Sequence, residues 1–123
     1  MQKIMLPLGG TERQIKFTIN AIQEMEAHIF DKNVLTMMSR EVWSITDIIT
    51  VCYCGLRACD KTVTRKEVQE WVVEYASQQE SGIMHLQMIL SGAIGISGLI
   101  GTKQKSVFEG ILANVNKTEE SGK

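Results

Sequence analysis

The stretch IMLPLGGTERQIKFTINAIQEMEAHI, residues Ile4–Ile29, decides the fold because the spacing of its apolar residues changes partway along. On both sides of Gly9-Gly10, apolar and polar residues alternate, as in a β-strand with one buried face. Adjacent glycines adopt the positive φ angles of a tight hairpin turn at little cost, and Pro7, which lacks an N–H group, suits an edge strand. We therefore expect an N-terminal β-hairpin over residues 1–18. Its buried face should hold Ile4, Leu6 and Leu8, then Ile15, Phe17 and Ile19 after the turn.

From Ile19 onward the apolar residues recur at the spacing of one helix face. We expect a first helix that ends near Phe30, because Asp31-Lys32-Asn33 interrupts the pattern. A further short helical piece should follow over residues 34–38. The buried face of the first helix is predicted to hold Ile19, Ile22, Met25 and Ile29.

Capping residues mark the start of a second long helix. Ser44 is followed three residues later by Asp47, an arrangement close to a capping box with Asp in place of Glu. The helix should span about Ile45–Cys59. Its buried stripe is predicted to hold Ile45, Ile48, Ile49, Cys52, Leu56 and Cys59.

A full capping box, Thr64 with Glu67, begins the next helix. We expect this helix to span about Arg65–Gln79. The residues predicted on its apolar face are Val68, Trp71, Val72 and Tyr75.

The length and composition suit a single folded domain. The chain has 123 residues, of which 44% are hydrophobic and 22% charged, as in ordinary soluble domains. The predicted fold class is mainly α, with an N-terminal β-hairpin packed on a bundle of about four to five helices. We expect residues 1–102 to form this single helical domain. Residues 103–123 should form a short helix and a flexible polar tail.

Residues 81–102 contain no charged side chain, and glycine recurs at every third position from Gly92 to Gly101. A large apolar surface is costly to expose in a monomer, so we expect this stretch to dock on another subunit or on a client protein. The alternative is a small membrane-associated protein anchored by residues 82–101, although glycines and polar residues weaken a membrane span. The candidate protein-binding residues are Ile83, Leu86, Met88, Ile89, Leu90, Ile94 and Leu99.

The sequence lacks the usual patterns of catalytic, metal and cofactor sites. Cys52, Cys54 and Cys59 do not have the C-x-x-C spacing of a zinc site, and we expect Cys52 and Cys59 to lie in the core. Neither histidine accompanies a nucleophile elbow, and the glycine spacing fits neither a Rossmann turn nor a phosphate loop. We therefore expect no enzyme activity, no cofactor, no metal and no small-molecule substrate.

Charge and cysteine usage bear on partners and compartment. The formal net charge of -1 gives no electrostatic support to nucleic-acid binding. A transcription regulator that uses residues 63–75 is a further alternative, but Glu67, Glu70 and Glu74 would repel phosphate. An odd number of clustered cysteines suits a reducing compartment, and the N-terminal apolar stretch is too brief for a signal peptide. We expect a cytoplasmic protein that binds other proteins.

Two segments carry a pattern found in a known family. The first, Leu8–Glu26, has the sequence LGGTERQIKFTINAIQEME, in which a glycine turn leads through a strand into a helix near FTxxAI. The second, Ile48–Arg57, has the sequence IITVCYCGLR and precedes Asp60 and the helix capped by Thr64. In order and spacing, these segments resemble the tail assembly chaperones of long, non-contractile-tailed phages and related gene transfer agents. The resemblance covers about residues 4–75.

The resemblance implies a helical protein that forms a homo-oligomer in the cytoplasm of the bacterial host. Such a protein binds the tape measure protein and keeps it soluble while the tail tube protein assembles around it. The resemblance also implies a short form and a longer, frameshifted form, of which this chain would be the short one.

Overall fold

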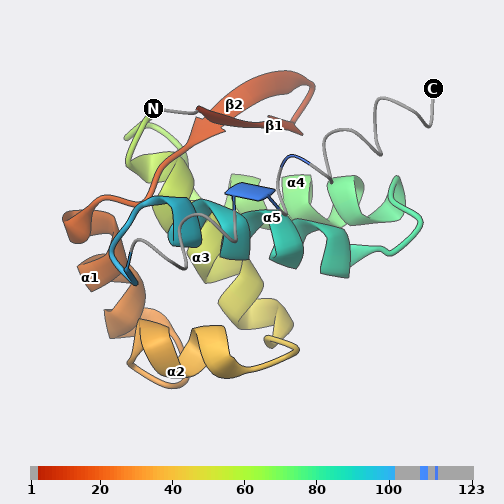
Figure 1. Ribbon diagram of the computed structural model, residues 1–123. Coiled ribbons are helices and arrows are strands. Elements are labelled where there is room, and N and C mark those ends of the chain that lie inside the picture. The colour runs from red at the N-terminus through yellow and green to blue at the C-terminus, as the bar shows by residue number, and fades with distance from the viewer. Residues whose placement is uncertain (1–2, 102–108, 111–112, 114–123) are drawn as a thin grey trace.

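The computed structural model describes residues 3–101, 109–110 and 113. In this part of the chain an antiparallel hairpin precedes five helices, so the fold is mainly α with an N-terminal hairpin, as predicted (Figure 1). The short helix and tail predicted for residues 103–123 fall almost entirely outside the described residues. The elements are β1 (Ile4–Leu8), β2 (Thr11–Ile15), α1 (Ile19–His28), α2 (Val34–Ser39), α3 (Ile45–Arg57), α4 (Arg65–Ser77) and α5 (Ile83–Ile96).

The hairpin turns through Gly9 and Gly10, whose φ angles are +63° and +78°. Positive φ at both central residues is the signature of a type I′ turn, whose twist matches that of the flanking strands. The register pairs Leu8 with Thr11 next to the turn. The buried residues of the two strands are Ile4, Leu6, Leu8 and Ile15, all predicted there.

The second strand ends earlier than the alternating pattern predicted, whereas the first helix begins at Ile19 as predicted. β2 ends at Ile15, and Thr18 caps α1 by accepting a hydrogen bond of 3.1 Å from the Ala21 N–H group. Phe17 is buried between the two elements as predicted, but Ile19 is 57% exposed and the prediction was wrong there. Ile19 is the first residue of α1 and lies at its N-terminal end. The buried residues of the helix lie further along the chain.

The central element is α3, which packs against α1, α4, α5 and β2. Its buried residues cover nearly the whole circumference rather than one stripe. The predicted stripe was wrong at Ile45, which is 62% exposed, and at Cys59, which is also exposed. The helix begins at Ile45 and ends at Arg57, so these residues lie at or beyond its ends, where neighbouring elements do not cover them. The rest of the stripe is buried as predicted: Ile48, Ile49, Cys52 and Leu56.

The capping box of α4 is present. Thr64 Oγ1 accepts from the Glu67 N–H group at 3.2 Å, and Glu67 Oε1 accepts from the Thr64 N–H group at 3.1 Å. Trp71, predicted on the apolar face, is half-buried because the hairpin turn covers it. The Arg13 guanidinium lies 4.0 Å from the centroid of the Trp71 ring. The fully covered residues of this face are Val68, Val72 and Tyr75.

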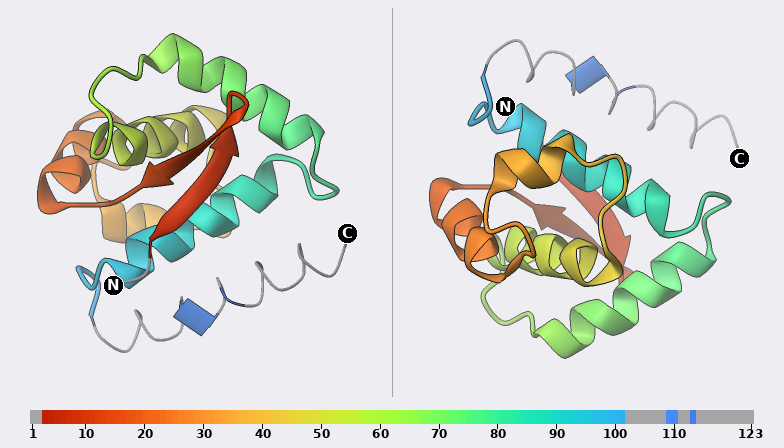
Figure 2. Two further views of the ribbon diagram at one scale, coloured as in Figure 1. Left: turned by 90° about the horizontal axis from the view of Figure 1, so that it is seen from above. Right: turned by 90° about the horizontal axis from the view of Figure 1, so that it is seen from below.

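One hydrophobic core joins these elements. It contains side chains from both strands and from each helix α1 to α5. The hairpin lies across one end of the helices, and α2 lies at the opposite end (Figure 1). Seen from above, β2 runs on the side of the hairpin that faces α3 (Figure 2). The two connections that flank α2 are therefore far from the hairpin.

Replacing Gly9 with alanine should destabilise the protein more than replacing Gly10 with alanine. A residue with a Cβ pays about 1–2 kcal/mol in the left-handed region, and both positions share this cost. At Gly9 the new Cβ would also lie 2.6 Å from Trp71 Cε2, whereas no such contact within 4 Å exists at Gly10. Overpacking adds about 1–3 kcal/mol. Urea unfolding measures the difference, and equal losses in both variants would contradict the packing of the turn on Trp71.

Candidate protein-binding surface

Most residues predicted to bind other proteins are buried in the protein itself. Leu86, Leu90 and Ile94 are 0% exposed, and Ile89 is 6% exposed. These residues belong to α5, which packs against both α3 and α4. Burial within the chain explains why this stretch carries no charge, and a partner has no access to these side chains in this structure.

The outer side of α5 and the turn that follows it present a few partly exposed apolar side chains. Met88 and Leu99, both predicted to bind protein, are 40% and 48% exposed, and Ile83 is half-buried. Met84 adds a side chain that is 37% exposed. Among the described residues, no helix is both long enough and apolar enough to cross a membrane.

The buried polar side chains of α5 are hydrogen-bonded to neighbouring elements. Gln87 Oε1 accepts from the Trp43 N–H group at 2.8 Å, and Gln87 Nε2 donates to the Glu41 carbonyl at 2.9 Å. His85 Nδ1 lies 2.7 Å from the Tyr75 hydroxyl of α4. Since a buried amide without partners would be costly, Gln87 fixes the connection between α2 and α3 in one position.

Four large apolar side chains around α2 are more exposed than any of those in and after α5. They come from the connection after α1, from α2 itself, from the connection after α2 and from the first residue of α3. Phe30 is the most exposed of them, at 79%. Large apolar side chains exposed on neighbouring segments of a soluble protein are typical of interaction sites. We call this set the Phe30 surface; it consists of Phe30, Leu35, Val42 and Ile45.

Hydrogen bonds hold the Phe30 backbone in place. The Phe30 N–H group donates to Asp47 Oδ1 of α3 at 3.1 Å, and Asp47 is only 4% exposed. Lys32 adopts a positive φ of 56°, and its Nζ donates to the Ala27 carbonyl at 2.7 Å. The Val34 N–H group donates to a carboxylate oxygen of α1. This connection therefore presents Phe30 to solvent from a fixed backbone.

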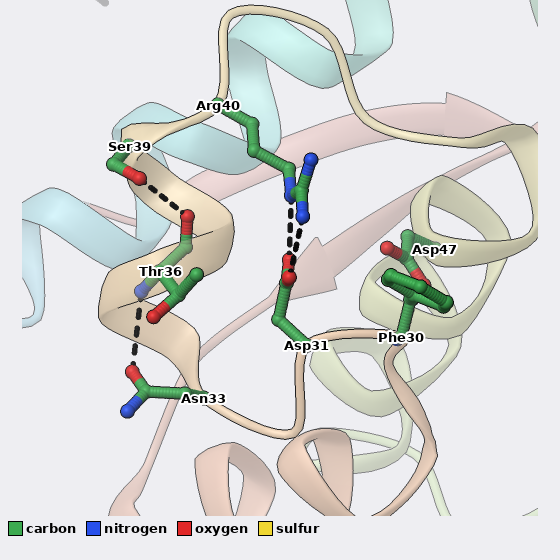
Figure 3. Close-up of polar contacts among 7 residues, drawn as sticks. All are labelled: Phe30, Asp31, Asn33, Thr36, Ser39, Arg40 and Asp47. Carbon is green, nitrogen blue, oxygen red and sulfur yellow. Dashed lines mark hydrogen bonds and ion pairs between the residues drawn. The ribbon is translucent and has the colours of Figure 1, made fainter.

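An ion pair lies next to the Phe30 ring. Arg40 donates to both carboxylate oxygens of Asp31, at 2.8 and 2.7 Å, and its guanidinium carbon lies 6.0 Å from the Phe30 ring centroid (Figure 3). The hydrogen bonds from Arg40 lower the pKa of the Asp31 carboxyl below its ordinary value. The ion pair therefore links the connection between α1 and α2 to Arg40, the residue that follows α2.

This arrangement has the chemistry of a protein-binding site. Binding energy at interfaces is concentrated in aromatic and arginine side chains, and a fixed backbone reduces the entropy lost on binding. The site was not predicted from the sequence because Phe30 was placed at the end of the first helix, Val42 was assigned to no element, and Ile45 was assigned to a buried stripe. Two sequence features could have revealed the site. Phe30 is a large apolar residue beside a helix break, and Ile45 is one directly after the N-cap residue of a helix.

Replacing Arg40 with glutamine should raise the pKa of the Asp31 carboxyl toward its ordinary value. A lowered carboxyl pKa stabilises the fold above the pKa of the unfolded chain, and this contribution is lost as the pH falls through the folded pKa. The difference in stability between wild type and variant should therefore shrink below about pH 4. Carboxyl-carbon NMR titration of Asp31 measures the shift. The same pKa in both proteins would contradict the ion pair.

The cysteines divide into buried and exposed thiols. Cys52 and Cys54 are buried in α3, and burial is the main cause that raises the pKa of each thiol to about 12. Cys59 is exposed, contrary to the prediction, because it lies beyond the end of α3. Within the described part of the chain, no group of three or more metal-ligating side chains is close enough to hold an ion.

In the native protein, Cys59 should be the thiol that reacts with a disulfide reagent at neutral pH. The thiolate is the reactive form, and the buried thiols of Cys52 and Cys54 are both inaccessible and protonated. All three cysteines should react after unfolding. A colorimetric thiol assay counts them, with Cys59→Ser as the control. Rapid reaction of native Cys59→Ser would contradict the burial of the other thiols.

Comparison of the chain with protein-family models, with curated proteins and with solved structures found no match.

Proposed function

We propose that this chain is a non-catalytic tail assembly chaperone of the type found in long, non-contractile-tailed phages. In this proposal it binds the tape measure protein in the host cytoplasm, keeps it soluble and helps the tail tube protein to assemble. It acts as a homo-oligomer. The observation on which the proposal chiefly depends is the Phe30 surface, which offers a client an apolar site on a fixed backbone.

The contacts between the two segments that resemble the family also support the proposal. The Lys16 N–H group, in the first segment, donates to the Gly55 carbonyl of the second segment at 3.1 Å. Gly55 belongs to the GLR end of α3, and its missing side chain leaves room for the Phe17 ring. A Cβ at Gly55 would lie 2.8 Å from Phe17 Cζ. The residues that carry the resemblance therefore work as one structural unit.

The chemistry of a tape measure client suits such a site. A long helical client exposes apolar stripes before assembly, and these stripes need apolar partners to stay in solution. An aromatic side chain with an arginine beside it is a common anchor for such contacts. Phe30 with Arg40 fits this role.

Co-expression of the chain with a long helical tape measure protein should keep that client in the soluble fraction. Phe30→Ser should weaken binding by about 2 kcal/mol, or roughly thirtyfold, because an exposed anchor is lost while the core is unchanged. Val73→Ser is the matched control: Val73 is 69% exposed on α4, away from the Phe30 surface, and its loss should leave binding unchanged. Pull-down and sedimentation of the client give both readouts. A client that stays equally insoluble with and without the chain would overturn the proposal.

A further inference from the structure

Two separate core residues hold the two ends of the Phe30 surface. The Phe30 end is held from α3, where the buried Asp47 accepts a hydrogen bond from the Phe30 N–H group at 3.1 Å. The Val42 end is held from α5, where the buried Gln87 side chain bonds to the connection between α2 and α3. The surface therefore depends on two different helices of the core.

The Gln87 amide binds the backbone on both sides of Val42. Its Oε1 accepts from the Trp43 N–H group at 2.8 Å, and its Nε2 donates to the Glu41 carbonyl at 2.9 Å. Within the described part of the chain, these are the only hydrogen bonds that the backbone of residues 41–43 makes. Val42 is 61% exposed, so the hydrogen bonds that support its backbone come from a single buried side chain.

The chemistry of this contact suits an amide in particular. A primary amide carries an acceptor and two donors on one planar group, so it satisfies a backbone N–H group and a backbone carbonyl together. An ionised carboxylate in the same place would still accept from Trp43, but its second oxygen would face the Glu41 carbonyl with no proton between them. A protonated carboxyl group has one O–H donor and can make both contacts again.

We propose that Gln87 is a positioning residue of the Phe30 surface, which sets the affinity for a client that it does not touch. Gln87 is 5% exposed, so a client on this surface reaches Val42 and not the amide. Without the amide, residues 41–43 must be ordered when the client binds, and the entropy lost in ordering them weakens binding. This inference rests on the proposed function and names α5 as a helix through which the core controls the site.

Gln87 can be replaced without removing the apolar contacts of α5. This helix packs against α3 and α4, and Leu86, Leu90 and Ile94 are 0% exposed in these contacts. Replacement of Gln87 leaves those side chains in place, so the variants should fold. Circular dichroism and urea unfolding of each variant check this.

The pH dependence of client binding by Gln87→Glu tests the inference. The probe is a helical peptide selected by display on the full-length chain and kept only if Phe30→Ser abolishes its binding. Burial disfavours the charged form, so the introduced carboxyl should titrate above its ordinary pKa. Below that raised pKa the variant should bind the probe within about twofold of wild type, and above it about tenfold more weakly.

Gln87→Met is the matched control, because its side chain has a similar length but no donor. It should bind the probe about tenfold more weakly than wild type at every pH. Wild type is measured at each pH to correct for the titrating groups that all three proteins share. Carboxyl-carbon NMR follows the introduced carboxyl. If this group titrates while the affinity ratio of Gln87→Glu to wild type stays constant, the inference is wrong.

A double-mutant cycle separates positioning from a general loss of structure. If Gln87 acts through Val42, the effect of Gln87→Met on affinity should disappear in a Val42→Ser background. It should persist in full in a Leu35→Ser background, since Leu35 lies on α2 and is 60% exposed. Equal effects in the two backgrounds would overturn the inference.

Amide hydrogen exchange of the free chain gives a reading that needs no client. The Trp43 amide should be protected in wild type and should exchange rapidly in Gln87→Met. Slow exchange in both would show that the connection is held without the amide, and would overturn the inference. A probe that depends on Phe30 but not on Gln87 would overturn this inference alone. If no probe depends on Phe30, the surface has no client and the proposed function fails with it.

Discussion

The burial of α3 on nearly every side is the constraint on which the rest of the structure depends. Neighbouring elements meet this helix closely, as at Gly55, where the Phe17 ring occupies the space that a side chain would need. The same residue accepts the Lys16 N–H group and so fixes where the hairpin joins the bundle. A helix surrounded in this way has few places for polar groups, and its buried Asp47 accepts a hydrogen bond from the Phe30 N–H group.

Two buried polar side chains show how the bundle controls its connections. Asp47 of α3 accepts a hydrogen bond from the Phe30 backbone, and Gln87 of α5 holds the backbone on both sides of Val42. The connections around α2 are therefore positioned by residues of the core. This explains how apolar side chains at the end of the bundle stay exposed without collapsing onto it, and why a surface made of connections still has a defined shape.

The hairpin and the start of α4 could be predicted because their signals are local. Gly9-Gly10 defines a turn by backbone geometry, and the Thr64–Glu67 capping box satisfies its own hydrogen bonds within one helical turn. The place of α5 could not be predicted in this way, because an uncharged stretch looks the same whether its own chain or a partner covers it. The Phe30 surface depends on contacts between residues 30 and 47, which helical periodicity does not register.

The placement of the two tryptophans has a practical consequence. Trp43 is 3% exposed in the connection held by Gln87, near the Phe30 surface, whereas Trp71 lies beneath the hairpin turn with the Arg13 guanidinium over its ring. Each indole thus senses a different end of the molecule. Intrinsic fluorescence, with one indole at a time replaced by phenylalanine, provides a label-free optical reporter for events at either end.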